Sequence, residues 1–190
     1  MIKNRKDYKR FVSTEVMTAE SMFQKIKGAL CTTTNSYIKT LRKLEYHHNS
    51  KGLFHKVLSF IYFLRWHHLS VKLGIYIPKN VCDEGLTLYH YGSIVVNPNS
   101  HIGKNCCIQN NVNIGANVGE EAAPQIGDNV YIGPGAIIFG NINIADNCYI
   151  GANAVVTKSI DEPYSVVVGA PAKAIKKEKQ NWLEKQNNIR

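Results

Sequence analysis

The sequence lacks the features that mark membrane-spanning, secreted and zinc-binding proteins. Its longest apolar run, residues 57–64, is eight residues long and includes Ser59, whereas a membrane-spanning helix needs about 18. No apolar segment follows the first seven residues, MIKNRKD, so we expect no signal peptide. The five cysteines form no CxxC pair and are odd in number, which argues against a zinc knuckle and a disulfide framework. We therefore expect a cytoplasmic protein with reduced cysteines.

Acidic residues are scarce at both ends of the 190-residue chain, whose formal net charge is +9. Residues 1–72 contain 14 Lys and Arg against 4 acids (net +10), residues 73–172 contain 3 against 8 (net −5), and residues 173–190 contain 6 against 2 (net +4). Such a basic excess favours an anionic partner, either nucleic acid or a membrane surface. Because neither stacked aromatics nor a recognised motif accompanies the charge, we expect no nucleic-acid binding.

The middle of the chain has a period of six residues. An aliphatic residue recurs at every sixth position, interrupted once, at Val96, Ile102, Ile108, Ile114, Ile126, Ile132, Ile138, Ile144, Ile150 and Val156. A second series of mostly small or aliphatic residues lies four positions after each of these, and Gly and Asn are frequent between them. The period is neither that of a helix nor that of an alternating strand. It predicts short flat strands joined by tight turns, three to a triangular coil, that stack into a parallel β-helix.

The repeat is interrupted at two places. Upstream, the six-residue series that contains Leu88 ends, and a series offset by two residues begins at Val96. His90 lies in the segment where the register of the repeat shifts. Downstream, residues 115–124 put Glu120 where an aliphatic residue is expected, which predicts a loop that leaves the coil. Because regular coils are occupied with packing, we expect functional residues at the interruptions.

The two ends of the chain are predicted to be helical. Apolar residues form three helical stripes in the N-terminal region. They are Ala19, Met22, Phe23, Ile26, Ala29 and Leu30; Tyr37, Ile38, Leu41 and Leu44; and Leu53, Phe54, Val57, Leu58, Ile61 and Leu64, widened by Phe60, Phe63 and Trp66. The third stripe either packs against the β-helix or a partner subunit, or forms a basic, aromatic surface that contacts anionic lipid. We expect a basic α-helical region (1–73), a β-helix (74–172) and a basic tail (173–190) that is a short helix or a frayed end.

Three segments carry a family resemblance. Residues 85–96 (GLTLYHYGSIVV) resemble the active-site segment of serine acetyltransferases. Residues 135–141 (GAIIFGN) resemble a later coil of the same family, and residues 168–173 (VGAPAK) resemble its closing signature. These are hexapeptide-repeat acyltransferases, and the resemblance covers about residues 74–175. It implies a left-handed β-helix, acetyl-CoA as co-substrate, and a homotrimer with active sites between adjacent prisms.

The chain departs from serine acetyltransferases at three positions. Tyr89 stands where the family has an Asp before the active-site His, and Ile75 stands where the family has the Asp that orients this His. Ala123 replaces a second His of the protruding loop. Since these positions hold the amino acid or tune the base, the chain resembles the branch that O-acetylates sugars in capsule, exopolysaccharide or lipopolysaccharide biosynthesis. Serine O-acetylation in cysteine biosynthesis and a catalytically weakened scaffold are the alternatives.

Acetyl transfer from a thioester to a hydroxyl requires a base and donors for the oxyanion. Of the seven histidines, His90 is the predicted base and His101 the alternative, because the others lie in basic helical stretches. With no Asp at position 75, a backbone carbonyl, Asp83 or Glu84 is expected to orient the ring of His90. No metal is expected, because a zinc carbonic anhydrase of this fold needs three converging imidazoles.

The resemblance also suggests the residues that bind the two substrates. Small residues that let the pantetheine arm approach are Gly115, Gly135, Ala136 and Ala152, and Lys158 and Lys173 are candidates for the nucleotide phosphates. The acceptor, a glycan or a small molecule, is expected to contact Tyr89, Glu120 and Glu121.

Overall fold

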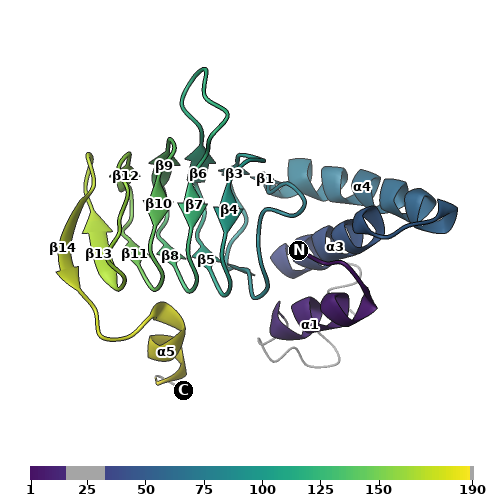
Figure 1. Ribbon diagram of the computed structural model, residues 1–190, viewed down its shortest axis with the longest axis horizontal. Coiled ribbons are helices and arrows are strands. Elements are labelled where there is room, and N and C mark those ends of the chain that lie inside the picture. The colour runs from purple at the N-terminus through teal and green to yellow at the C-terminus, as the bar shows by residue number, and fades with distance from the viewer. Residues whose placement is uncertain (16–32, 189–190) are drawn as a thin grey trace.

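The computed structural model describes residues 1–15 and 33–188 (Figure 1). Three helices, α1 (Arg5–Glu15), α3 (Thr34–Asn49) and α4 (Leu53–Leu73), precede the β-region, and a short helix, α5 (Trp182–Asn187), follows it. The apolar stripe predicted from Ala19 to Leu30 lies outside the described residues. Within the described ranges, no helix has the length and apolar content that crossing a bilayer requires.

Fourteen short strands form three sheets. Sheet A contains β1 (Ile75–Tyr76), β3 (Ile94–Val96), β6 (Val112–Gly115), β9 (Ile137–Phe139) and β12 (Val155–Val156). Sheet B contains β4 (His101–Ile102), β7 (Gln125–Ile126) and β10 (Asn143–Ile144). Sheet C contains β2 (Thr87–Leu88), β5 (Cys107–Ile108), β8 (Tyr131–Ile132), β11 (Tyr149–Ile150), β13 (Ser165–Val168) and β14 (Lys173–Lys177). All neighbouring strands are parallel except β13 and β14.

Regular coils advance by 18 residues, which is three hexapeptides. Tyr131 pairs with Tyr149 in sheet C, and Ile137 pairs with Val155 in sheet A. The aliphatic residue of each hexapeptide is buried and stacks on its equivalent in the next coil, so the core is one continuous column. The parallel β-helix predicted from the six-residue period is therefore confirmed.

Asparagine closes the turns between sheets B and C. Asn105, Asn129 and Asn147 have φ angles of 54°, 56° and 61°, a left-handed conformation that Asn tolerates better than most residues. Their side-chain amides also form a ladder, with the Nδ2 of Asn105 and Asn129 donating to the next Oδ1 at 3.2 and 3.1 Å.

Both predicted interruptions of the repeat are present as insertions. Thr87 pairs with Cys107, 20 residues away, although Ile94 pairs with Val112 at the regular 18, so the turn between β2 and β3 holds two extra residues. In the next coil Asn113 pairs with Ile137, 24 residues away. The six extra residues lie within the nine-residue loop 116–124, which projects from the β-helix beyond β6 (Figure 1).

A buried arginine fastens the N-terminal helices to the first coil. Arg42 of α3 is fully buried, and its guanidinium donates to Glu15 of α1 at 2.7 Å and to Glu45 at 2.8 Å. It also donates to the backbone carbonyls of Cys82 at 2.8 Å and Asp83 at 2.6 Å. No local periodicity of the sequence indicates this contact.

The C-terminal tail is docked rather than frayed. Lys173–Lys177 form strand β14 and not a helix, whereas the helical prediction holds for α5. Helix α5 packs on the outer face of sheet C, where the indole N–H of Trp182 donates to the carbonyl of Asn105 at 3.0 Å. The hydroxyl of Tyr149 donates to the carbonyl of Gln180 at 2.9 Å.

Candidate active site

His90 lies in the widened turn between β2 and β3. The turn is held by its backbone against the end of α4, because Gly92 N–H donates to the carbonyl of Leu73 at 3.0 Å and Ile94 N–H donates to that of Gly74 at 2.9 Å. The side chains of Tyr89, His90 and Tyr91 are exposed. The two-residue insertion therefore frees His90 from packing and presents it at the edge where sheets C and A meet.

No acid orients the imidazole of His90, which makes no hydrogen bond or ion pair within residues 1–15 and 33–188. Asp83 lies 3.4 Å from Nε2 of His101, and Glu84 pairs with Arg10 at 2.6 Å. The expectation that Asp83 or Glu84 fixes the ring is wrong, because both carboxylates face other partners. Ile75 is 1% exposed and pairs with Ile94, so this position adds apolar packing beneath the turn.

The turns that follow β2, β5, β8 and β11 stack along one edge of the prism. Gly135 N–H donates to the carbonyl of Asn110 at 3.0 Å, and Asn153 N–H donates to that of Pro134 at 2.9 Å. His90, Gly135 and Ala152 therefore lie in successive or nearby turns of this edge. Lys173, which is exposed, begins β14 after the turn that follows β13.

Gly135 and Ala152 have the properties expected of positions that a ligand approaches closely. Gly135 has a φ of 72°, and a Cβ there would collide with the side-chain oxygen of Asn153. Ala152 is exposed, and its N–H has no acceptor in the described part of the chain. Ala136 differs from the prediction, because its side chain is fully buried in the core, and its carbonyl accepts a hydrogen bond from Asn113 at 3.0 Å.

The remaining predicted site residues lie at the other edge of sheet A. Gly115 ends β6, and a Cβ there would lie 2.8 Å from the ring of Phe139. Glu120 and Glu121 are exposed in the loop 116–124, and Lys158 is exposed in the turn after β12. Within one chain these residues are separated from His90 by the strands of sheet A, about 10–13 Å at 3.3 Å per residue. Within one chain, Tyr89 and Glu120, both predicted to contact the acceptor, therefore lie at different edges of the prism.

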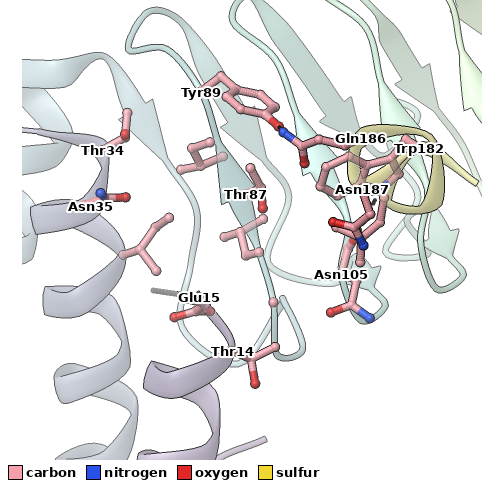
Figure 2. A pocket seen from close by; sticks show the side chains of 15 residues that line it. Thr14, Glu15, Thr34, Asn35, Thr87, Tyr89, Asn105, Trp182, Gln186 and Asn187 are labelled. Carbon is pink, nitrogen blue, oxygen red and sulfur yellow. Dashed lines mark hydrogen bonds between the residues drawn. The ribbon is translucent and has the colours of Figure 1, made fainter. Parts of the chain in front are cut away.

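A cavity of about 220 Å³ lies between β2, the N-terminal helices and α5 (Figure 2). Hydroxyl and amide side chains line much of it, together with the indole of Trp182. Tyr89 points toward α5, where its hydroxyl accepts a hydrogen bond from Nε2 of Gln186 at 2.6 Å. His90 itself does not line the cavity. Because three distant segments form this cavity, no local pattern of the sequence predicts it.

Other chemistries find no support in the described residues. Burial raises the pKa of both Cys106 and Cys107 to about 12, so neither thiol is a ready nucleophile. Within the ranges 1–15 and 33–188, no group of three or more His, Cys, Asp or Glu residues is arranged to hold a metal ion.

Comparisons with known proteins agree with this fold. Residues 123–158 match the model of the family described as Bacterial transferase hexapeptide (six repeats). The serine acetyltransferase from Brucella abortus strain S19 has 24% identity and a TM-score of 0.68, covering 90% of this chain and 68% of that one. The chain has the serine acetyltransferase fold.

Further solved structures give the same result. The Neisseria gonorrhoeae serine acetyltransferase in complex with serine is 25% identical with a TM-score of 0.64, and the soybean apoenzyme is 23% identical with a TM-score of 0.66. Each comparison covers 90% of this chain and 68% of the other. No curated protein matches the sequence.

Proposed function

We propose that the protein transfers an acetyl group from acetyl-CoA to a hydroxyl group, with His90 as general base. The observation that carries this proposal is the two-residue insertion that exposes His90 at an edge lined further along by Gly135 and Ala152. The serine acetyltransferase fold supports it. We place the reaction in the cytoplasm, where acetyl-CoA is available.

The reaction needs no covalent enzyme intermediate if both substrates are held together. His90 takes the proton of the acceptor hydroxyl while the hydroxyl oxygen attacks the thioester carbonyl. The proton then passes from His90 to the departing thiolate of coenzyme A. We expect the N–H of Ala152 to donate to the pantetheine arm and Lys173 to contact the nucleotide phosphates. Because no carboxylate among the described residues of the same chain orients His90, turnover is expected to be slow.

The proposed active unit is a homotrimer. Glu120, Glu121 and Lys158 lie at the opposite edge of sheet A from His90, so one chain does not bring the proposed site together. A neighbouring prism would place its own loop against the His90 edge. A stable monomer at micromolar concentration in light scattering would contradict this assembly.

Subunit mixing tests the shared site directly. A His90→Ala variant and a Glu120→Gln/Glu121→Gln variant, each weakened alone, should recover part of the activity when co-assembled, because some interfaces then combine an intact histidine with an intact loop. Activity that stays at the mean of the two separate variants would argue that each chain works alone.

For the acceptor we propose a sugar hydroxyl of a capsule, exopolysaccharide or lipopolysaccharide precursor. Ile75 and Ala123 are each 1% exposed and apolar, so neither supplies a charged group for the ammonium or carboxylate of an amino acid. The cavity beside Tyr89 offers hydroxyl and amide groups suited to a polyhydroxylated ligand. The second candidate is serine O-acetylation, which the likeness to solved serine acetyltransferases supports better than it supports the sugar.

An acceptor assay separates these candidates. The protein is incubated with acetyl-CoA and either L-serine or a panel of free and nucleotide-linked sugars, and release of free coenzyme A thiol is followed. Robust turnover with serine would overturn the sugar proposal, and turnover with a sugar alone would support it. If calorimetry detects no binding of acetyl-CoA, the weakened scaffold is favoured.

The role of His90 is tested by two matched variants. His90→Ala should lower kcat by roughly 10²–10⁴-fold, the usual span for loss of a general base, while acetyl-CoA affinity stays nearly unchanged. His101→Ala removes the other histidine of the β-helix, which is half exposed beside Asp83, and should leave kcat close to the original. The opposite pattern would transfer the role to His101.

A further inference from the structure

The exposed side of α4 is an apolar surface that no other described segment covers. Seven large apolar side chains of this helix are between 51% and 78% exposed: Leu53, Phe54, Val57, Phe60, Ile61, Leu64 and Val71. We call these residues the α4 face. Their spacing of three and four places them on one side of the helix over most of its length. Large contiguous apolar patches on a protein surface usually mark interaction sites.

The α4 face lies opposite the side of α4 that packs on the protein. Trp66, Leu69 and Leu73 are buried, and Tyr62 packs against the same core. At 100° per residue these positions lie about 180° from the α4 face. The helix is thus apolar on both sides, yet only one side packs against other residues that the structure describes. Figure 1 shows α4 at the opposite end of the molecule from β14, on the outside of the helical region.

The charged residues of α4 that border the α4 face are all basic. Lys56 lies along one border, and Arg65 and Lys72 lie along the other. The sequence from residue 46 to residue 82 contains no Asp or Glu. An apolar stripe between two basic borders is the pattern of helices that lie in a membrane interface, with the apolar side chains among the acyl chains and the cations among anionic headgroups.

We infer that the α4 face binds the surface of an anionic membrane, with α4 lying in the plane of the interface. A second copy of the chain fits less well, because two such faces would bring their basic borders together with no acid between them. The inference does not depend on the acetyltransferase proposal, since it uses neither His90 nor acetyl-CoA.

Vesicle sedimentation with the full chain tests the inference. The protein should pellet with phosphatidylcholine vesicles that contain about 30% phosphatidylglycerol, and should remain in the supernatant with phosphatidylcholine alone or at high salt, which screens the charges. Lys56→Glu/Arg65→Glu should weaken binding by about 30-fold or more, because each basic residue near an anionic surface contributes about a factor of five. Phe60→Ser/Leu64→Ser should weaken it at least about tenfold by removing inserted side chains.

Matched controls keep the test specific. Ile175→Ser replaces an apolar side chain of 60% exposure at the far end of the molecule, and Lys179→Glu reverses an exposed charge there. Both should bind vesicles as the original does, and circular dichroism should show that all variants remain folded. Absence of binding to anionic vesicles, or equal binding by the α4 and control variants, would overturn the inference. If the protein does not bind vesicles, and Phe60→Ser/Leu64→Ser dissociates a larger assembly in light scattering, the α4 face is instead assigned to a contact with a second copy.

Discussion

Replacing Arg42 by Met should lower the free energy of unfolding by about 3–5 kcal/mol, the usual cost of removing one partner from a buried ion pair. The guanidinium is fully buried and donates to Glu15, Glu45 and the carbonyls of Cys82 and Asp83 at 2.6–2.8 Å. Met fills a similar volume but donates no hydrogen bond. Two buried carboxylates and two carbonyls then lose this donor, and the contacts that Arg42 makes between α1, α3 and the first coil are lost.

The loss should depend on pH in a defined direction. Burial raises the pKa of Glu15 to about 7, even though Arg42 opposes the shift. Without Arg42 the charged carboxylate is still less favourable, so the folded-state pKa rises further. A carboxyl group whose pKa is higher in the folded state contributes stability at low pH, and this contribution is lost as the pH rises through that pKa. The destabilisation by Arg42→Met should therefore be smaller at pH 5 than at pH 8.

Urea denaturation followed by circular dichroism measures both effects. The matched control is Glu15→Leu/Arg42→Met/Glu45→Leu, in which the whole buried cluster becomes apolar; this variant should recover most of the lost stability, because no buried charge remains unpaired. A loss below about 1 kcal/mol for Arg42→Met, within the range of an exposed pair, would refute the assignment of the cluster as the fastening of the helical region.

Three further predictions follow from the described contacts. The stability of the original chain should fall by about 3 kcal/mol between pH 4.5 and 7 through Glu15 alone, and Glu15→Gln should remove this part of the decline in urea titrations at a series of pH values. Gly135→Val should weaken acetyl-CoA binding at least about tenfold in calorimetry, because the new side chain enters the proposed groove and collides with Asn153. The control Gly119→Val should leave this binding unchanged, because Gly119 has a similar positive φ but a Cβ there would meet no atom within 4 Å. Trp182→Ala should release α5 from sheet C, lower Tm and expose the tail to limited proteolysis, and an unchanged cleavage pattern would contradict the docking.

The six-residue period determined the β-helix, both interruptions and the position of His90 before any contact was known. This was possible because each coil of a solenoid contacts only its neighbours, so the position of Ile132 between Ile108 and Ile150 follows from a local period. The same local argument places Asn105 and Asn129 in turns, since their backbone conformation favours a few residue types.

Tertiary structure alone decided which groups surround the candidate site. Arg42 meets carbonyls 40 and 41 residues away, and α5 returns to contact Asn105, 77 residues earlier in the chain. Tertiary structure also decided that Asp83 faces His101 and not His90. It decided as well that the loop 116–124 leaves the edge of sheet A opposite His90. A local period specifies which side of a strand a residue faces, but the side chain's partner depends on how distant segments pack, and no spacing in the sequence encodes that packing.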